Sequence, residues 1–350
     1  MCSYSSTACS SRYYGVASSA YGIIRPIGEG SFGVVMMARK LETGETVAIK
    51  RIPLKSDRRS EIEVIREMFA LRNTDHENVV KLLDIISGGD TISLVMEYVE
   101  SNLKLVIEDV RRPLNDSVVK FYLFQLLCGV AYLHSIGIMH RDLKPQNVMI
   151  SAEGKLKITD FGQACLYFAN DPNRTYEHQV ASRWYRAPEL LFGSTKYTPK
   201  VDLWSCGCIL AELLNGAPLF AGRNDLEQIA LVMAVLGSPN EQNWKGWSDL
   251  PDSRKIVFDS IEAVSDWSTV VPLASWECID LLQHLLVYSD ELRYSAADAL
   301  SHRYLLDSIP SRAPYVPPPV SQQQSKRDTT VLEYDPNIDV SSQFYGIADL

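Results

Sequence analysis

The sequence lacks any stretch of about twenty apolar residues, so we expect no membrane-spanning helix and no insertion into a membrane. It also lacks an excess of basic residues. There are 34 Lys and Arg against 43 Asp and Glu in 350 residues, a formal net charge of −9. This balance disfavours a general nucleic-acid binder. The N-terminus is rich in Ser and Tyr without a long apolar run, which disfavours a signal peptide. We therefore expect an intracellular protein.

Cysteine is scarce as well. The seven cysteines are scattered and odd in number, so a disulfide framework is not expected and a reducing compartment fits. Cys206 and Cys208 are two positions apart, but no second Cys or His pair follows at metal-ligand spacing. We interpret them as buried small apolar residues.

The pattern of apolar residues changes along the chain. With 46% hydrophobic residues the chain can bury a full core, and we expect two lobes that share one cleft. Short β-type runs are predicted around 23–27, 34–38, 46–50 and 92–99, and helices over 61–72, 115–134, 201–215 and 225–236. The expected fold is α+β and bilobal, with a small β-rich lobe over about 21–98 and a large helical lobe over about 103–305. Residues 1–20 and the Pro-rich residues 306–350 are predicted to be tails.

One stretch carries a recognisable chemical pattern, His140-Arg141-Asp142-Leu143-Lys144-Pro145-Gln146-Asn147. Asn147 follows Asp142 by five positions, and Asp160-Phe161-Gly162 begins eighteen positions after Asp142. In a phosphoryl-transfer site, one carboxylate accepts the proton of the attacking hydroxyl, while an amide and a second carboxylate hold Mg²⁺. Each acid alone is most often an exposed or capping residue. The order and spacing of the set favour the chemical interpretation.

A glycine-rich loop separates the first two predicted strands. Similar patterns occur in dinucleotide-binding oxidoreductases, where they lead from a strand into a helix. Here apolar residues follow Gly33, so a hairpin flap is the better interpretation. The alternative of a nucleotide-binding oxidoreductase is supported by this loop alone. Missing side chains let the backbone approach phosphate oxygens and permit positive φ. The flap predicted to cover a nucleotide is Ile27, Gly28, Glu29, Gly30, Ser31, Phe32, Gly33, Val34 and Val35.

Lys50 ends the third predicted strand. A lysine there often just extends its ammonium to water. The next predicted helix, however, offers Glu67 seventeen residues later, and such a pair would hold the lysine toward nucleotide phosphates. The strand over 92–99 ends at the joint between the lobes, where the backbones of Glu97 and Val99 are predicted to bind an adenine.

With these residues in place, the chain resembles the eukaryotic protein kinases over about residues 21–305. The glycine loop, Val47-Ala48-Ile49-Lys50, Glu67, the catalytic loop, Asp160-Phe161-Gly162 and Ala187-Pro188-Glu189 occur in the family's order. The resemblance implies ATP and Mg²⁺ as cofactors. It implies Asp142 as base, Lys144 on the transferring γ-phosphoryl, Lys50 with Glu67 on the α- and β-phosphates, and Asn147 with Asp160 on Mg²⁺. Lys144 is typical of serine/threonine kinases, and Arg293 is expected to pair with Glu189.

Further motifs look like the cyclin-dependent kinase group. They are Trp184-Tyr185-Arg186-Ala187-Pro188-Glu189 and Pro218-Leu219-Phe220-Ala221-Gly222. Within the group, residues 178–183 and 215–228 look most like cell-cycle-related kinase, a branch associated with cilium assembly and length control. This resemblance implies protein substrates with Ser/Thr-Pro sites, because Arg186 and the Val180 backbone form a pocket for proline. It also implies a location in the cytoplasm, nucleus or cilium.

Four departures from the group concern regulation. Phe32 replaces the glycine-loop tyrosine whose phosphorylation inhibits many relatives. Glu177 stands where the group has its activating threonine, and Cys165 replaces an arginine that binds the phosphothreonine. We predict that Glu177 substitutes for that phosphate, with Arg66 and Arg141 as partners; the alternative is an ordinary exposed acid. The segment that docks cyclin in the group, residues 61–67, differs here from the group's usual sequence, so the need for a cyclin or other activator stays open.

A pseudokinase scaffold that binds partners without transferring phosphate is the alternative function. It predicts damage to Lys50, Asp142, Asn147 or Asp160. All four are present, so an active serine/threonine kinase is the favoured interpretation.

Overall fold

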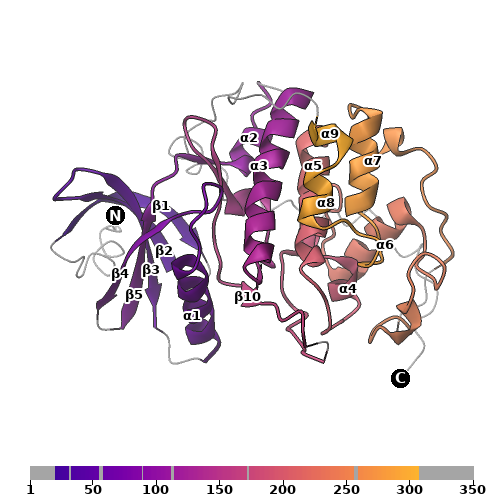
Figure 1. The fold of residues 1–350 in the computed structure, drawn as a ribbon, viewed down its shortest axis with the longest axis horizontal. Coiled ribbons are helices and arrows are strands. Elements are labelled where there is room, and N and C mark those ends of the chain that lie inside the picture. Colours follow the sequence, from indigo (N-terminus) through magenta and orange to yellow (C-terminus); the bar gives the residue numbers. More distant parts are fainter. Residues whose placement is uncertain are drawn as a thin grey trace, which may run out of the picture.

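The structure is a computed structural model that describes residues 20–30, 33–54, 58–88, 90–111, 114–171, 173–255 and 259–306. The predicted tails lie outside these residues, apart from Ala20 and Leu306 at their inner ends. Figure 1 shows two lobes side by side, with the early strands in one and most helices in the other. The α+β, two-lobed fold expected from the sequence is confirmed.

The small lobe is built on one antiparallel sheet in the order β1-β2-β3-β5-β4. One face of the sheet buries Ala38, Val47, Ile49 and Val95. Because side chains alternate along a strand, Lys50 next to Ile49 faces the opposite side, where it meets Glu67 and Asp160. The strands are β1 (Tyr21–Gly30), β2 (Gly33–Lys40), β3 (Thr46–Pro53), β4 (Leu82–Gly88) and β5 (Thr91–Glu97).

Strand β4 was not predicted from the sequence. It pairs only with β5, at the edge of the sheet. Asp84 and Ser87 interrupt its apolar pattern, and much of it is exposed, as is common on sheet edges. Helix α1 (Arg58–Arg72) lies beside this sheet on the side of the large lobe (Figure 1).

The large lobe is centred on α3 (Asp116–Ser135) and α5 (Lys200–Asn215). All residues of α5 from Val201 to Leu213 are buried, as expected of a helix surrounded by others. By length and composition alone α3 could cross a membrane, but its apolar residues from Val118 to Leu133 are packed in the core. Asn115 caps α3 by accepting from the Val118 N–H.

The other helices surround these two. They are α2 (Leu103–Ile107), α4 (Pro188–Leu191), α6 (Asp225–Leu236), α7 (Trp276–Leu285), α8 (Ala296–Leu300) and α9 (Arg303–Leu306). In the part of the chain that the structure describes there are also 3₁₀ turns: η1 (Pro145–Asn147), η2 (Arg183–Tyr185), η3 (Trp247–Asp249) and η4 (Trp267–Thr269).

Short strands frame the catalytic stretch. Strand β7 (Ile138–Met139) ends just before His140, and β8 (Val148–Ile150) begins directly after Asn147. Asp160 comes two residues after β9 (Leu156–Ile158). These strands pair with β10 (Cys165–Leu166) or β6 (Ser101–Asn102), or with each other. The polar residues of the site are therefore fixed at the ends of buried pairings.

Candidate active site

A buried aspartate shapes the catalytic loop. Asp202, from α5, accepts hydrogen bonds from the backbone N–H groups of His140 and Arg141 at 2.9 and 2.8 Å, and lies 2.8 Å from His134 Nε2. Burial opposes its charge, but these donors outweigh burial and lower the pKa of the carboxyl. Arg141 has a φ of 65°, a conformation that a non-glycine residue keeps only when its surroundings hold it. Asp202 supplies that hold.

Asp142 is held by bonds to both of its carboxylate oxygens. Oδ1 accepts from the backbone N–H and the hydroxyl of Ser182, each at 2.8 Å. Oδ2 accepts from Lys144 Nζ at 2.8 Å and from Asn147 Nδ2 at 3.1 Å. Lys144 Nζ also donates to the Ser182 hydroxyl at 2.8 Å. The expected base and its lysine are therefore adjacent, and Ser182 joins them as a site residue that sequence reasoning missed.

Asn147 and Asp160 present oxygens suited to a magnesium ion. The Asn147 amide NH₂ donates to the backbone oxygen and the carboxylate of Asp142, which leaves the amide oxygen as the available ligand. Asp160 uses Oδ1 to accept from Lys50 at 2.8 Å. Amide and carboxylate oxygens are the ligands that Mg²⁺ prefers, so these two residues fit the ion. Phe161 is buried against His140, with ring centroids 4.9 Å apart, which keeps Asp160 in the cleft.

Lys50 links the small lobe to Asp160. Its ammonium donates to both oxygens of Glu67, at 2.7 and 2.8 Å, as well as to Asp160. Burial alone would lower the pKa of Lys50, but the two carboxylates outweigh it and raise that pKa. Burial likewise opposes the charge of Asp160, yet Lys50 lowers the pKa of this carboxyl. Both groups are charged at neutral pH.

The flap has the hairpin geometry expected of it. Strands β1 and β2 pair through Gly30 and Gly33. At Gly33 φ is 153°, and a Cβ would lie 2.0 Å from the Arg51 carbonyl oxygen, so glycine is required by the protein itself. A Cβ at Gly28 would meet only ordinary contact, so packing within the protein does not require glycine there. Ile27, Val34 and Val35 are half-buried. Ser31 and Phe32, and the side-chain environment of Glu29, lie outside the described residues.

The predicted adenine contacts lie where the two lobes join. Glu97 ends β5, and Val99 follows it as a buried residue. The Glu97 carboxylate accepts from the Lys81 backbone N–H and from Lys157 Nζ, both at 2.8 Å. These bonds fix the end of β5 against the large lobe.

Glu177 meets one of its two predicted arginines directly. Arg66 donates Nη1 and Nη2 to the two carboxylate oxygens at 3.1 and 3.2 Å. Arg141 instead donates Nη1 to the hydroxyl of Tyr197 at 2.9 Å, and that hydroxyl donates to the Glu177 backbone oxygen at 2.5 Å. The expected direct Arg141–Glu177 contact is therefore wrong. Tyr197, which the sequence analysis missed, stands between them because the side chain of Glu177 points out to Arg66.

The two residues predicted to form a substrate pocket, Val180 and Arg186, lie together with Ala181. Arg186 donates Nε to the Val180 carbonyl and Nη2 to the Ala181 carbonyl, each at 2.9 Å. Ala181 has a φ of 65°, so the chain turns sharply here. Behind it, the predicted Arg293–Glu189 pair is present at 2.7 and 3.0 Å and is buried.

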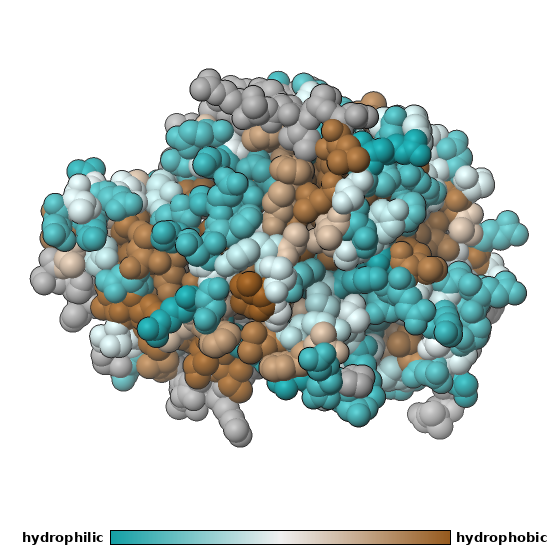
Figure 2. Space-filling view, in the orientation of Figure 1, coloured by the Kyte–Doolittle hydropathy of each residue, from teal (hydrophilic) through white to brown (hydrophobic). Residues whose placement is uncertain are grey.

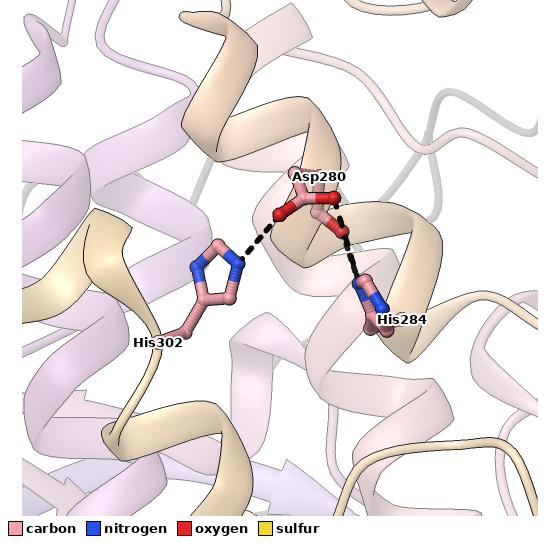
Figure 3. Close-up of side chains that lie close together, drawn as sticks. All are labelled: Asp280, His284 and His302. Carbon is pink, nitrogen blue, oxygen red and sulfur yellow. Dashed lines mark hydrogen bonds and ion pairs between the residues drawn. The ribbon is translucent and has the colours of Figure 1, made fainter.

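A second cluster of ionisable groups lies away from the cleft. Asp280 and His284 from α7 meet His302 beside α9 (Figure 3). His302 Nδ1 accepts from the Tyr304 N–H, so its Nε2 carries the proton that is donated to Asp280 at 2.9 Å. His284 Nδ1 donates to the Asp280 backbone oxygen at 2.7 Å. These bonds occupy the histidine nitrogens that face Asp280, and the cluster joins α7 to α9.

Comparison with known proteins agrees with this geometry. The model of the protein kinase domain family matches residues 21–305. Cyclin-dependent kinase 20 of Danio rerio is 48% identical over 305 residues, covering 85% of this chain and 87% of the relative. The Homo sapiens protein of the same name is 45% identical over 303 residues, covering 84% and 86%.

Two solved structures share the fold. The kinase chain of the yeast RNA Pol II CTD kinase CTDK-1 complex superposes with a TM-score of 0.75 and 32% identity, covering 87% of this chain and 97% of that one. The CAK complex of Chaetomium thermophilum bound to ATP-gamma-S gives a TM-score of 0.79 and 32% identity, covering 85% and 95%. The chain therefore belongs to the protein kinase family, as a serine/threonine kinase of the cyclin-dependent kinase type.

Proposed function

We propose that this kinase is proline-directed and phosphorylates Ser or Thr followed by Pro. The observation that carries the proposal is the conformation of residues 180–182, where Ala181 is left-handed and Arg186 binds both the Val180 and Ala181 carbonyls. The residue that follows the target Ser or Thr would direct its backbone N–H toward the Val180 and Ala181 carbonyls, which already accept from Arg186. An unsatisfied N–H costs about 1–3 kcal/mol. Proline has no N–H and avoids that cost.

The residues around Asp142 supply the proton chemistry. Asp142 is positioned to accept the proton of the substrate hydroxyl, since Ser182 and Asn147 fix the orientation of its carboxylate. Lys144, 2.8 Å from Asp142, is placed to steady the negative charge of the moving phosphoryl group. Lys50, fixed by Glu67, would orient the α- and β-phosphates of ATP. Mg²⁺ held by Asn147 and Asp160 would neutralise phosphate charge.

The first experiment measures phosphate transfer from ATP to matched peptides with Pro or Ala after the target Ser. We expect Mg²⁺-dependent transfer with a clear preference for Pro. Asp142→Asn should lower kcat about 10²–10⁴-fold, the usual effect of losing a positioned base, without changing the melting temperature greatly. Unchanged turnover in Asp142→Asn would show that Asp142 is not the base. Absence of transfer by wild type would favour the scaffold alternative, and equal rates on the two peptides would refute proline direction.

We further propose that a cyclin-type partner binds over α1. Ile62, Ile65 and Phe69 on α1 are exposed, and Ile65 and Phe69 line a hollow of 450 Å³ together with Leu166. Figure 2 shows hydrophobic surface on the side of the molecule where α1 lies. Exposed apolar patches of this kind mark interaction sites, and the similar solved chains come from complexes. Ile65→Asp should abolish activation by an added partner while leaving basal turnover measurable, and an unaffected response would exclude this face.

The cellular role proposed here is cilium assembly or length control, with the protein in the cytoplasm, nucleus or cilium. The support is the similarity to cyclin-dependent kinase 20 and the motifs shared with cell-cycle-related kinase. Replacing the native chain with Asp142→Asn in ciliated cells should change cilium length. Normal cilia in such cells would refute the role.

A further inference from the structure

The substrate loop, residues 180–182, has four successive backbone polar groups that are each bound by a side chain from outside the loop. The Val180 and Ala181 carbonyls accept from Arg186, and the Ser182 N–H donates to Asp142. The fourth group is the Ala181 N–H, which donates to the side-chain oxygen of Gln163 at 2.8 Å. Arg186 and Asp142 were predicted site residues, whereas Gln163 has no role in the chemistry described above.

Gln163 is well placed to join the parts of the active site. It lies three residues after Asp160, so its backbone belongs to the segment that would hold the metal ion. Its own carbonyl accepts from Arg141 Nε at 2.7 Å. One residue therefore connects the metal-holding segment, the catalytic loop and, through its side chain, the substrate loop.

The bond from Gln163 falls where the loop needs support. Ala181 has a φ of 65°, a conformation that is unfavourable for residues with a Cβ and persists where surrounding contacts hold it. Ala181 is also buried, so its N–H cannot turn to water without moving the loop. Removing the Gln163 oxygen would leave a buried donor unpaired in a strained turn, and the loop would relax.

We propose that Gln163 is a positioning residue for substrate selection. It holds Ala181 left-handed, and thereby maintains the pocket that distinguishes Pro from other residues after the target Ser or Thr. Gln163 acts through the loop backbone, because its side-chain oxygen is bonded to the Ala181 N–H. The inference deepens the proposed proline-directed activity and rests on it.

The test compares Gln163→Met, which keeps length and removes the oxygen, with Gln163→Glu, which keeps an acceptor. Gln125→Met is the matched control, because Gln125 also accepts from a backbone N–H, that of Leu156 at 3.0 Å, away from the cleft. For each full-length protein, kcat and KM are measured with the Pro and Ala peptides and with ATP.

We expect Gln163→Met to raise the KM for the Pro peptide about threefold to tenfold, the range set by one net hydrogen bond, and to lower the Pro/Ala ratio of kcat/KM. The KM for ATP should stay within about twofold. Gln163→Glu should recover most of the Pro/Ala ratio, and Gln125→Met should not change it. An unchanged ratio in Gln163→Met, an equal loss on both peptides or a loss confined to kcat would each overturn the proposal.

Two further outcomes are kept separate. If Gln163→Met melts well below Gln125→Met, Gln163→Asn replaces it, because the shorter amide loses its reach to Ala181 but stays polar; its Pro/Ala ratio then decides by the same criterion. If wild type transfers no phosphate, or shows no preference for Pro, the proposed function fails rather than the role of Gln163. Wild type with a clear preference that survives in the Gln163 variants refutes only the positioning role.

Discussion

Two adjacent residues of α1 form ion pairs in very different surroundings. Glu67 pairs with Lys50 at 2.7 Å, and these side chains are 3% and 11% exposed. Arg66 pairs with Glu177 at 3.1 Å, and these side chains are 27% and 60% exposed. The first pair faces the cleft and the second faces the activation segment.

The difference in burial decides what each pair can contribute. Removing one partner of a buried pair leaves an uncompensated charge and costs about 3–5 kcal/mol. An exposed pair contributes about 0–1 kcal/mol and is screened by salt. The site therefore requires the buried Lys50–Glu67 pair, called the inner pair. The exposed Arg66–Glu177 pair, called the outer pair, can only bias the position of α1. Since both pairs are on one helix, a small bias at Arg66 reaches Lys50 through Glu67.

The largest effect is expected from breaking the inner pair. Lys50→Met leaves Glu67 and Asp160 without their shared cation, so we expect kcat to fall at least about 10²-fold and unfolding free energy to fall by about 3–5 kcal/mol. Arg66→Met is the matched control on the outer pair and should cost at most about 1 kcal/mol. Turnover and urea unfolding of the two variants measure the contrast. Equal losses would show that burial does not separate the pairs.

A smaller effect is expected from the buried support beneath Glu177. Burial raises the pKa of Tyr197 from 10.0 to about 12. Because the folded value lies above the unfolded one, its contribution is complete below pH 10 and is lost as pH rises toward 12. Two pH units correspond to about 2–3 kcal/mol.

The comparison uses Tyr197→Phe, which cannot ionise. Urea unfolding at pH 8, 10 and 11 should show wild type losing its advantage over the variant as pH rises. At pH 8 the variant should be less stable, because Arg141 and the Glu177 carbonyl both lose the hydroxyl. Parallel pH curves would mean that the Tyr197 hydroxyl ionises equally easily in the folded and unfolded states.

The sequence predicted residues whose spacing along the chain is diagnostic. Lys50, Glu67, Asp142, Asn147 and Asp160 follow a fixed order, and the structure brings them together in one cleft. The helices and most of the main strands that were predicted from the sequence are also present. Among the described residues, the elements that escaped include the edge strand β4, whose apolar pattern is interrupted, the two- or three-residue strands, and the helices α2, α4, α7, α8 and α9. Most of these elements are too short to show a period.

The contacts that sequence reasoning missed act across the fold. Ser182 reaches Asp142 forty positions away, Asp202 reaches Arg141 sixty-one positions away, and Gln163 reaches Ala181 eighteen positions away. Ser, Asp and Gln are common at surfaces, and no local period marks them. Their roles arise only after α5 and the activation segment pack against the catalytic loop. Tyr197, which lies between Arg141 and Glu177, escaped prediction for the same reason.

The smallest effect is expected at Glu177 itself, where we propose that the carboxylate substitutes for an activating phosphate. The exposure of the Arg66–Glu177 pair limits the gain, so Glu177→Gln should lower kinase activity only a few-fold, the effect of about 1 kcal/mol. This effect on activity is smaller than the sequence alone suggests for a carboxylate that takes the place of an activating phosphate. The loss of activity in Glu177→Gln should shrink as NaCl is raised to about 0.5 M, because salt screens exposed ion pairs.

Glu177→Thr sharpens this prediction, because a phosphate can be restored there. Arg141 Nη2 is buried and makes no hydrogen bond within the described residues, so the single carboxylate of Glu177 leaves part of the arginine pair unused. A phosphate brings about −1.5 to −2 charge and three acceptor oxygens, enough for Arg66 and Arg141 together. Unphosphorylated Glu177→Thr should match Glu177→Gln, and the form phosphorylated by an activating kinase should equal or exceed wild type. Full activity of unphosphorylated Glu177→Gln and Glu177→Thr at low salt would show that Glu177 is an ordinary exposed acid and that α1 is positioned by the Lys50–Glu67 pair alone.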